Sequence, residues 1–447
     1  MAALALITAA CSNDDNEFAP QPQKAEGITI TAQLAPKTGG ATTRAVSDGG
    51  NKIISEWAEN EHIAILYEVS STKYVADATI TAVDGSGTAT ITFTVDGGTP
   101  DNTACTLVYP YSAAKDDKSG VKDAATLLSA QDGTLNANLD VRVGAGTIQT
   151  TTPGLTVTTQ PAAQFAIFKF TLSGPSIDAT HPLVIKDNAS NTTITTVTPA
   201  STATSVFVAM PAAASTTYKF VVITADNKYI KSGTATIEAG KYYQTPLTLE
   251  PRYPLALSSA TAEWDLGAVV CSDGNLYMEK NAAPSGKTAI GILGKVTETG
   301  HGLILALQDA TEQSWDTING WPSVTYYAGT TLKLLPDDAR GSLPSLIMLP
   351  TLLSDPFIVS NWCVAQKDDY SAIFKNLGSA TYMNGMMAYD ANVNAYITTG
   401  VGGTAMDGRY STATEYNLDD AWGFGNGYWV RNSVKSDSYN VRPVLGF

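Results

Sequence analysis

The strongest constraint on the fold is a period of two between residues 27 and 250, where apolar residues alternate with threonine or other polar residues. Residues 28–34 read Ile-Thr-Ile-Thr-Ala-Gln-Leu, and the same alternation recurs at 91–95, 166–172 and 218–222. Successive side chains of a strand point to opposite faces, so each run predicts a strand with one buried and one wet face. Turn-forming Gly, Asp and Asn clusters separate the runs. The pattern therefore predicts antiparallel sheets packed as sandwiches.

Breaks in this pattern suggest the domain organisation. A Thr- and Pro-rich stretch interrupts the alternation, so we expect two β-sandwich domains at 27–158 and 159–250. The composition changes after 251–254, because six of the seven tryptophans lie beyond this point. Irregular Gly-rich and aromatic-rich sequence, with one helical stretch at 369–377, predicts a loop-rich α+β domain at 251–447.

The chain begins with a short apolar run that ends in two alanines and Cys11, followed by an acidic tract. This order is typical of a bacterial lipoprotein signal, although the run has no basic residue and a start further upstream is expected. We expect residues 1–26 to be signal and acidic linker, with palmitate or a similar lipid on Cys11 holding the precursor in the outer membrane at the cell surface. The alternative is an incidental cysteine after a short apolar N-terminus.

The net charge of −15 and the pI near 4.6 argue against nucleic acid as a partner, since nucleic acids bind basic patches. Three widely spaced histidines and the lack of HExxH or GxSxG motifs argue against an enzyme. Asp390, Asn392 and Asn394 have the alternate spacing of a calcium loop, but Ala395 and Val401 replace its required Gly and Glu. We expect no enzymatic activity, no cofactor and no metal.

Three further cysteines, Cys105, Cys271 and Cys363, have no paired spacing. A bridge between Cys271 and Cys363 stays open at this point, and no other signal indicates a disulfide scaffold.

Short motifs follow one another in a fixed order over the first half of the chain: Thr43-Arg44-Ala45, Trp57, Ile63-Ala64-Ile65, Val108-Tyr109-Pro110-Tyr111, Gln131-Asp132-Gly133-Thr134 and Phe165-Ala166-Ile167-Phe168-Lys169-Phe170. In this order they resemble the fimbrillin family, the pilins of donor-strand pili in anaerobic bacteria. The resemblance implies two transthyretin-like β-sandwiches and partnership with other pilus subunits.

The resemblance also implies proteolytic maturation between Arg44 and Ala45, which would release the first strand. Its apolar residues would fill a groove before cleavage: Ile28, Ile30, Ala32 and Leu34. An exposed sheet edge of this kind is a template for a strand from another subunit. The alternative is an ordinary strand followed by a solvated loop arginine.

A second set of motifs lies in the last domain: Leu266-Gly267-Ala268-Val269-Val270, Asp273-Gly274-Asn275-Leu276-Tyr277, Gly302-Leu303-Ile304-Leu305-Ala306-Leu307, Trp315, Tyr410-Ser411-Thr412-Ala413-Thr414-Glu415, Ala421-Trp422 and Val441-Arg442-Pro443-Val444-Leu445-Gly446-Phe447. They resemble a surface-protein module related to C-type-lectin-like folds. A further motif of that module is present here only in a shortened form, Gly341-Ser342-Leu343-Pro344-Ser345. The resemblance implies a lectin-like C-terminal domain.

A glycan or protein ligand is expected on this last domain. Trp422, Tyr428 and Trp429 lie close in sequence to Asp420 and Asn426. Aromatic faces stack on sugar rings, while carboxylates and amides bind hydroxyl groups. The alternative places both tryptophans in the core of a small domain.

These expectations combine into a fimbrial tip subunit, an adhesin assembled by donor-strand exchange. The second sandwich ends near 243–249 and is followed by a further module in place of a strand to donate. The alternative is a cell-anchored surface lipoprotein that binds glycan or protein and does not polymerise.

Overall fold

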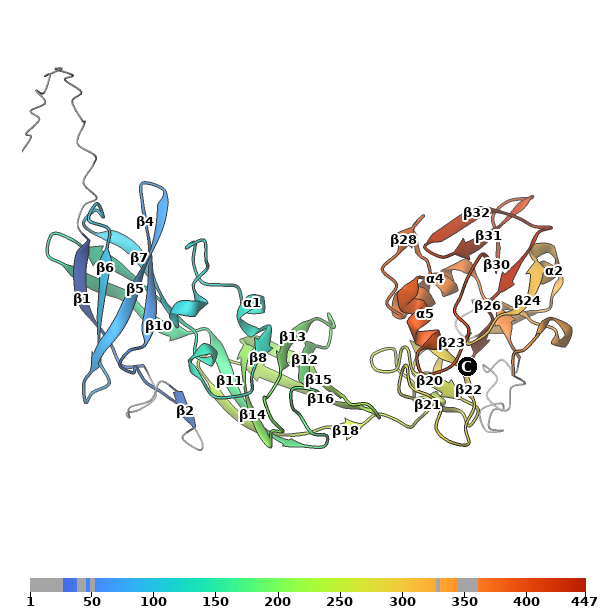
Figure 1. Ribbon diagram of the computed structural model, residues 1–447, viewed down its shortest axis with the longest axis horizontal. Coiled ribbons are helices and arrows are strands. Elements are labelled where there is room, and N and C mark those ends of the chain that lie inside the picture. Colours follow the sequence, from blue (N-terminus) through green and yellow to red (C-terminus); the bar gives the residue numbers. More distant parts are fainter. Residues whose placement is uncertain (1–26, 38–45, 49–52, 327–329, 345–360) are drawn as a thin grey trace, which may run out of the picture. The chain divides into compact units, whose positions relative to one another are not determined.

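The computed structural model describes residues 27–37, 46–48, 53–326, 330–344 and 361–447 (Figure 1). Cys11, Arg44 and Ala45 lie outside the described residues. The prediction of a mostly β protein is confirmed. The chain forms two compact units, of which the first comprises 1–220 with 231–248 and the second comprises 221–230 with 249–447.

The first sheet of the first unit has seven antiparallel strands in the order β1-β6-β5-β4-β7-β9-β10. Their bounds are β1 Ile28–Leu34, β4 His62–Val69, β5 Thr72–Val83, β6 Ala89–Val95, β7 Thr103–Tyr109, β9 Arg142–Gln149 and β10 Gly154–Ala163. The two end strands approach each other, so the sheet curls around one core of inward side chains (Figure 1). A separate short hairpin pairs β2 (Val46–Asp48) with β3 (Ile53–Ser55).

The second sandwich has a sheet of three strands and a sheet of six. The smaller sheet, in the order β14-β11-β17, contains β11 Phe165–Ser173, β14 Ser205–Pro211 and β17 Tyr242–Thr248. The larger, in the order β18-β16-β15-β12-β13-β8, contains β8 Ala130–Gln131, β12 Leu183–Asp187, β13 Thr193–Val197, β15 Ala213–Ile223, β16 Lys228–Ile237 and β18 Glu250–Pro251. Strand β17 runs parallel to β11.

The border between the first and second sandwiches does not fall at a single point in the sequence. Residues 158 and 159, where we expected the boundary, both lie inside β10. Strand β8, which precedes β9 in the chain, joins the second sandwich, and the short helix α1 (Ala124–Leu128) leads into it. The buried Gln131 amide explains this placement, because it donates to the Ala209 carbonyl at 3.0 Å and accepts from the Ala209 N–H at 2.8 Å. The Gln131 side chain thus joins β8, which pairs with β13 of the larger sheet, to β14 of the smaller sheet.

Strand β11 departs from the simple alternation predicted for it. Phe168 and Phe170 stack at 5.4 Å on one side, and Phe170 meets Phe220 of the facing sheet edge-on at 5.4 Å. Phe165 and Ile167 are also buried, in a separate apolar cluster that includes residues of the first sandwich such as Leu66. Both faces of the first half of β11 are therefore covered, which a period-two pattern alone does not indicate.

The second unit is built on a nine-stranded sheet in the order β19-β21-β20-β22-β23-β34-β27-β26-β25. Its strands are β19 Leu255–Ala256, β20 Val269–Cys271, β21 Asn275–Tyr277, β22 Ala289–Glu298, β23 His301–Ala306, β25 Ser323–Tyr326, β26 Thr330–Leu334, β27 Cys363–Val364 and β34 Val444–Gly446. A five-stranded sheet, in the order β24-β33-β30-β31-β32, contains β24 Ala310–Ser314, β30 Tyr410–Glu415, β31 Asp420–Gly425, β32 Tyr428–Val434 and β33 Ser438–Val441. A short hairpin pairs β28 (Tyr382–Met383) with β29 (Met386–Met387).

Helices α2 (Trp315–Gly320), α4 (Lys367–Asn376) and α5 (Ala391–Thr398) belong to the second unit. The predicted helical stretch 369–377 coincides with most of α4. Asp390 begins α5, since its carboxylate accepts hydrogen bonds from the N–H groups of Asn392 and Val393 at 2.9 and 3.3 Å. Of the three residues with calcium-loop spacing, Asp390 therefore serves as a helix cap, while Asn394 bonds to the backbone of Met406.

Candidate functional site

All seven residues of strand β1 pair with a neighbouring strand along one edge. It pairs antiparallel with β6 from Ile28 opposite Val95 to Leu34 opposite Ala89, and β1 ends the order of its sheet. The side chains of Ile30 and Leu34 are fully buried, whereas Thr29 and Thr31 point outward. Of the four residues predicted to fill a groove, Ile30, Ala32 and Leu34 are buried and Ile28 is half-buried.

The segment that follows β1 is held by buried groups of the same sandwich. The Trp57 indole N–H donates to the Ala35 carbonyl at 2.9 Å. The side chain of Lys37 is fully buried, with Nζ 3.5 Å from Asp140 Oδ2 and 3.9 Å from Glu61 Oε2. The sequence analysis did not identify Lys37 as a functional residue.

Two aromatic rings complete the surroundings of Lys37. Its Nζ lies 4.2 Å from the centre of the Trp57 ring and 3.7 Å from the centre of the Tyr109 ring, which pack edge-on at 88°. We call this set of four residues the cation box: Trp57, Glu61, Tyr109 and Asp140. Burial, the largest effect, lowers the pKa of Lys37 to about 8, and the two carboxylates oppose that shift. Lys37 is therefore mostly charged at neutral pH.

The structure does not bring the five predicted ligand-binding residues to one surface. Trp429 is buried at 2% exposure, and its indole N–H donates to the Met387 carbonyl at 2.7 Å, so this ring is part of the core. The Tyr428 ring packs against Gly425, where a Cβ would lie 2.2 Å from it. Asp420 accepts a hydrogen bond from Asn417 Nδ2 at 3.1 Å. Asn426 is exposed at the turn between β31 and β32.

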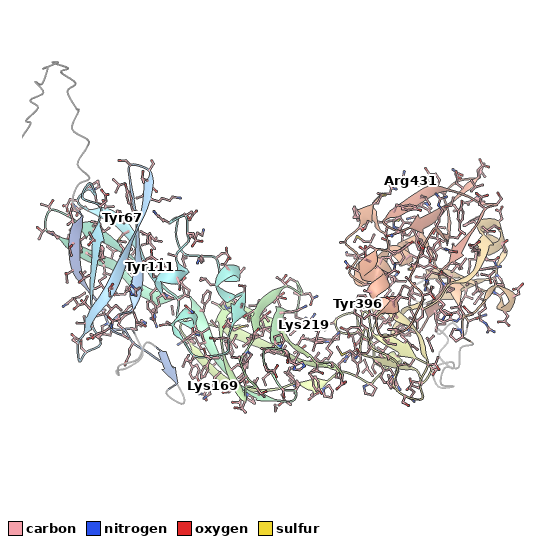
Figure 2. The ribbon with its side chains drawn as sticks, in the orientation of Figure 1. Tyr67, Tyr111, Lys169, Lys219, Tyr396 and Arg431 are labelled. Carbon is pink, nitrogen blue, oxygen red and sulfur yellow. The ribbon has the colours of Figure 1, made fainter. Side chains whose placement is uncertain are left out.

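Of the predicted set, Trp422 is the aromatic residue with the most suitable surroundings for a ligand. It is half-buried, and the exposed Tyr416 meets it edge-on at 5.6 Å. Lys367 Nζ and the Arg431 guanidinium lie 5.2 and 5.5 Å from the ring centre (Arg431 is labelled in Figure 2). We call Tyr416, Trp422, Lys367 and Arg431 the Trp422 cluster. An aromatic ring beside two cationic donors can stack on a sugar and bind its oxygen atoms.

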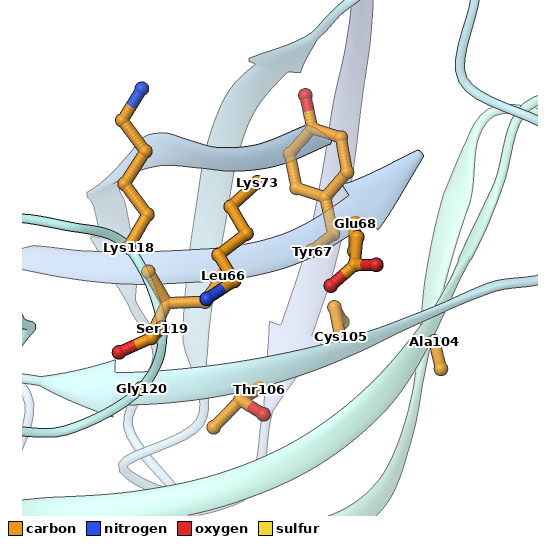
Figure 3. A pocket seen from close by; sticks show the side chains of 10 residues that line it. All are labelled: Leu66, Tyr67, Glu68, Lys73, Ala104, Cys105, Thr106, Lys118, Ser119 and Gly120. Carbon is orange, nitrogen blue, oxygen red and sulfur yellow. The ribbon is translucent and has the colours of Figure 1, made fainter. Parts of the chain in front are cut away.

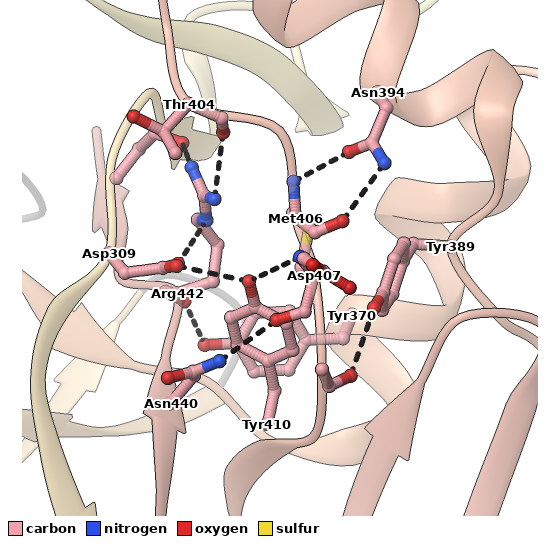
Figure 4. Close-up of polar contacts among 12 residues, drawn as sticks. Asp309, Tyr370, Tyr389, Asn394, Thr404, Met406, Asp407, Tyr410, Asn440 and Arg442 are labelled. Carbon is pink, nitrogen blue, oxygen red and sulfur yellow. Dashed lines mark hydrogen bonds and ion pairs between the residues drawn. The ribbon is translucent and has the colours of Figure 1, made fainter.

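A buried polar network holds the loop between α5 and β30 (Figure 4). The Arg442 side chain is fully buried and pairs with Asp309, with Nε 2.8 Å from Oδ1. It also donates to the carbonyls of Ala306 and Thr404, at 3.2 and 3.0 Å. The Tyr410 hydroxyl donates to Asp309 Oδ2 at 3.0 Å and accepts from the Asp407 N–H at 3.0 Å. Arg442 of the closing motif therefore has a structural role.

The described cysteines are buried free thiols, so Cys271 and Cys363 are not bridged. Burial raises their pKa values, to about 11 for Cys271 and about 12 for Cys363, which disfavours the reactive thiolate. A shallow pocket of about 250 Å³ lies beside Cys105, lined also by Glu68, Lys73 and the 118–120 loop (Figure 3). Burial raises the pKa of the Cys105 thiol as well, to about 12.

Two features are absent from the described part of the chain. No three His, Cys, Asp or Glu side chains there are grouped so that they could hold a metal ion. None of the helices there combines the length and apolar character that crossing a membrane requires.

No family model matches the chain, and no curated protein sequence matches it. Among solved structures, a fimbrial protein from Bacteroides ovatus aligns with 94% of this chain and 99% of its own, at 12% identity and a TM-score of 0.26. A candidate cell adhesion protein from Bacteroides ovatus covers 51% of this chain and 96% of its own, at 13% identity and a TM-score of 0.30. A minor pilin of Streptococcus agalactiae covers 50% and 96%, at 12% identity and a TM-score of 0.21. TM-scores this low do not establish a common fold.

Proposed function

We propose that the chain is a subunit of a surface pilus that accepts a strand from another subunit after its own β1 is released. The proposal rests on the pairing of β1. This seven-residue strand has β6 as its one pairing partner among the described strands, and its apolar face lies in the core. Loss of such a strand leaves the N–H and C=O groups of β6 and an apolar groove exposed. A strand with the same alternation restores both the hydrogen bonds and the burial.

Release would follow cleavage between Arg44 and Ala45, as the fimbrillin resemblance implies. The test is mass spectrometry of the full chain after treatment with an arginine-specific protease, beside an Arg44→Ala control. The proposal predicts a new N-terminus at Ala45 in the unaltered chain and none in the Arg44→Ala control. It also predicts that an added peptide with the β1 sequence displaces the β1 fragment from the cut chain. A chain that stays intact at Arg44, or a cut chain that never exchanges β1, contradicts the proposal.

A position at the pilus tip would account for the second unit. Strand β34 is hydrogen-bonded to β23 on one side and to β27 on the other, and Phe447 is buried. Donating β34 would break the nine-stranded sheet, so this strand is a poor donor. A subunit that accepts a strand and keeps β34 in its own sheet would fit a position at a fibre end. Immunogold labelling of assembled fibres tests this, and labelling along the whole shaft contradicts it.

The second unit would act as the adhesin, with the Trp422 cluster contacting a glycan or a protein. This cluster supports the proposal because it combines a half-buried ring with a neighbouring exposed tyrosine and two cations. A glycan and protein array probed with the full chain, and with Trp422→Ala, tests this step. A ligand whose binding is unaffected by Trp422→Ala would place the binding surface elsewhere.

Before maturation the chain would be an outer-membrane lipoprotein anchored through Cys11 and exposed at the cell surface. The alternative, an anchored binding lipoprotein that does not polymerise, keeps Cys11 permanently. The Arg44 experiment separates the two, because only the pilin loses its N-terminal segment.

A further inference from the structure

The ammonium group of Lys37 is enclosed although it belongs to the segment that cleavage after Arg44 would remove. Lys37 lies three residues beyond Leu34, the last residue of β1. Its side chain has no exposed area and ends between two rings and two carboxylates. The four residues of the cation box all come from 57–140, outside the released segment.

Glu61, Tyr109 and Asp140 are held by groups that stay behind when β1 leaves, whereas the Trp57 indole N–H donates to Ala35, which leaves with β1. Glu61 accepts a hydrogen bond from the Tyr109 hydroxyl at 2.5 Å and one from the Ala58 N–H at 3.0 Å. Both carboxylate oxygens of Asp140 accept from Arg142 Nε, at 2.9 and 3.0 Å. These three members of the box are therefore preformed, which lowers the ordering cost of binding a new occupant.

The groups around Lys37 explain why the occupant should be a cation. Nζ lies 3.9 Å from Glu61 Oε2 and 3.5 Å from Asp140 Oδ2, and the side-chain exposures of these two residues are 13% and 4%. When Lys37 leaves, both carboxylates lose a neighbouring cation in almost fully buried surroundings. An ammonium group over two aromatic faces is also attracted to both rings.

We propose that the cation box is a recognition site for a lysine ammonium group of the strand that replaces β1. The incoming strand would carry this lysine three residues beyond the side chain that takes the place of Leu34. The apolar groove accepts many alternating strands, so the box supplies a discrimination that the groove lacks. A partner without the lysine places no ammonium group between the two rings and the two carboxylates. This inference rests on the proposed strand exchange and adds the chemistry by which a partner is chosen.

The experiment uses the full chain cut after Arg44 and three synthetic peptides. The first has the sequence of residues 28–37, the second carries Lys37→Met, and the third carries Lys37→Met with Gln33→Lys. Gln33 is exposed in β1, so the third peptide keeps the charge and moves it out of the box. Fluorescence anisotropy measures the affinity of each labelled peptide. We expect the first peptide to bind about 10- to 100-fold more tightly than the other two.

The outcomes separate this inference from the function on which it rests. Equal affinity of the three peptides overturns the cation box as a selector and leaves strand exchange intact. Failure of every peptide to replace β1 overturns both. Equal affinity of the first and third peptides, with both binding more tightly than the second, also overturns the cation box as a selector. The lysine would then strengthen binding wherever it lies in the peptide.

A second measurement ties the effect to the box itself. In a cut chain with Asp140→Asn, the preference for the first peptide over the second should fall at least about threefold, since one carboxylate no longer needs a cation. An unchanged preference contradicts the proposal. The three-peptide comparison on the unaltered chain decides the question without this variant if Asp140→Asn does not fold.

Discussion

The Nζ atom of Lys37 lies 3.7 Å from the centre of the Tyr109 ring, while the hydroxyl of the same tyrosine donates a hydrogen bond to Glu61 at 2.5 Å. One aromatic residue thus contacts the cation with its face and orients a carboxylate beside that cation with its hydroxyl. This relationship fastens the chain just after β1, at the end of the strand nearest Leu34. It makes the attachment of β1 to its sandwich partly electrostatic.

Lys37→Met should destabilise the first unit by about 3 kcal/mol, because it removes the buried ammonium group beside Glu61 and Asp140 and over two aromatic rings. The value lies at the low end for a broken buried pair, since burial of the ammonium itself opposes folding. Urea unfolding followed by circular dichroism measures the change. Lys115→Met, at an exposed lysine, is the matched control and should shift the free energy of unfolding by less than about 0.5 kcal/mol. Equal effects of the two changes would contradict a role for the box.

The stability of the unaltered chain relative to Lys37→Met should rise between about pH 8 and 10.5. Burial lowers the pKa of Lys37 from 10.5 to about 8, so over this window the unfolded chain holds a proton that the folded chain has released. Stability increases with pH wherever the unfolded state binds more protons, by up to about 1.4 kcal/mol per pH unit here. Tyr109, whose pKa is raised by burial, acts the opposite way above pH 10 in both proteins and cancels in the comparison. A flat difference between the two pH profiles would contradict the burial of a charged Lys37.

Ile30→Ala should cost about 2–4 kcal/mol and should speed loss of the β1 fragment from the cut chain, because the side chain is fully buried in the first sandwich. Thr31→Ala is the control on the outer face of the same strand, with an expected effect below about 0.5 kcal/mol. Size-exclusion chromatography after cleavage, with the free fragment quantified over time, gives the rates. Similar rates for the two variants would mean that the apolar groove does not hold β1.

Arg442→Met should destabilise the second unit by about 3–5 kcal/mol, since it leaves the Asp309 carboxylate without its cation. Burial raises the pKa of Asp309, while Arg442 lowers it, so in the variant this carboxyl should protonate more readily. Six of the seven tryptophans lie in the second unit, and their fluorescence in urea follows its unfolding. Arg431→Met, at an exposed arginine, should have little effect on that transition.

Trp422→Ala should weaken binding of the ligand found on the array by about tenfold or more, with a stability loss well below that of Trp429→Ala. Trp429 is buried and bonded to Met387, so its truncation should cost about 3–5 kcal/mol. Thermal unfolding and binding titrations on both variants separate the two effects. If binding falls in proportion to the loss of stability in both Trp422→Ala and Trp429→Ala, the Trp422 cluster is not the ligand-binding surface.

The sequence by itself determined the strands that have one wet face. In 28–34 a strict alternation leaves one side-chain face apolar, and the structure has β1 with those bounds and with Ile30, Ala32 and Leu34 inward. The same reasoning located β6 at 91–95, and the separate prediction of a helix at 369–377 covers most of α4. It was incomplete for β11, because burial on both faces removes the polar half of the pattern.

Tertiary structure alone decided which polar and aromatic residues meet. Lys37, Glu61 and Asp140 are far apart in sequence, and only the curl of the first sheet brings them together. The residues next to Trp422 and Trp429 in the sequence do not indicate which ring is buried. In the structure, Trp422 lies at the bulge between β31 and β32 and is half-exposed, whereas Trp429 packs in the core. Local periodicity fixes which face of a strand is apolar, whereas burial of a particular ring or charge depends on elements distant in the chain.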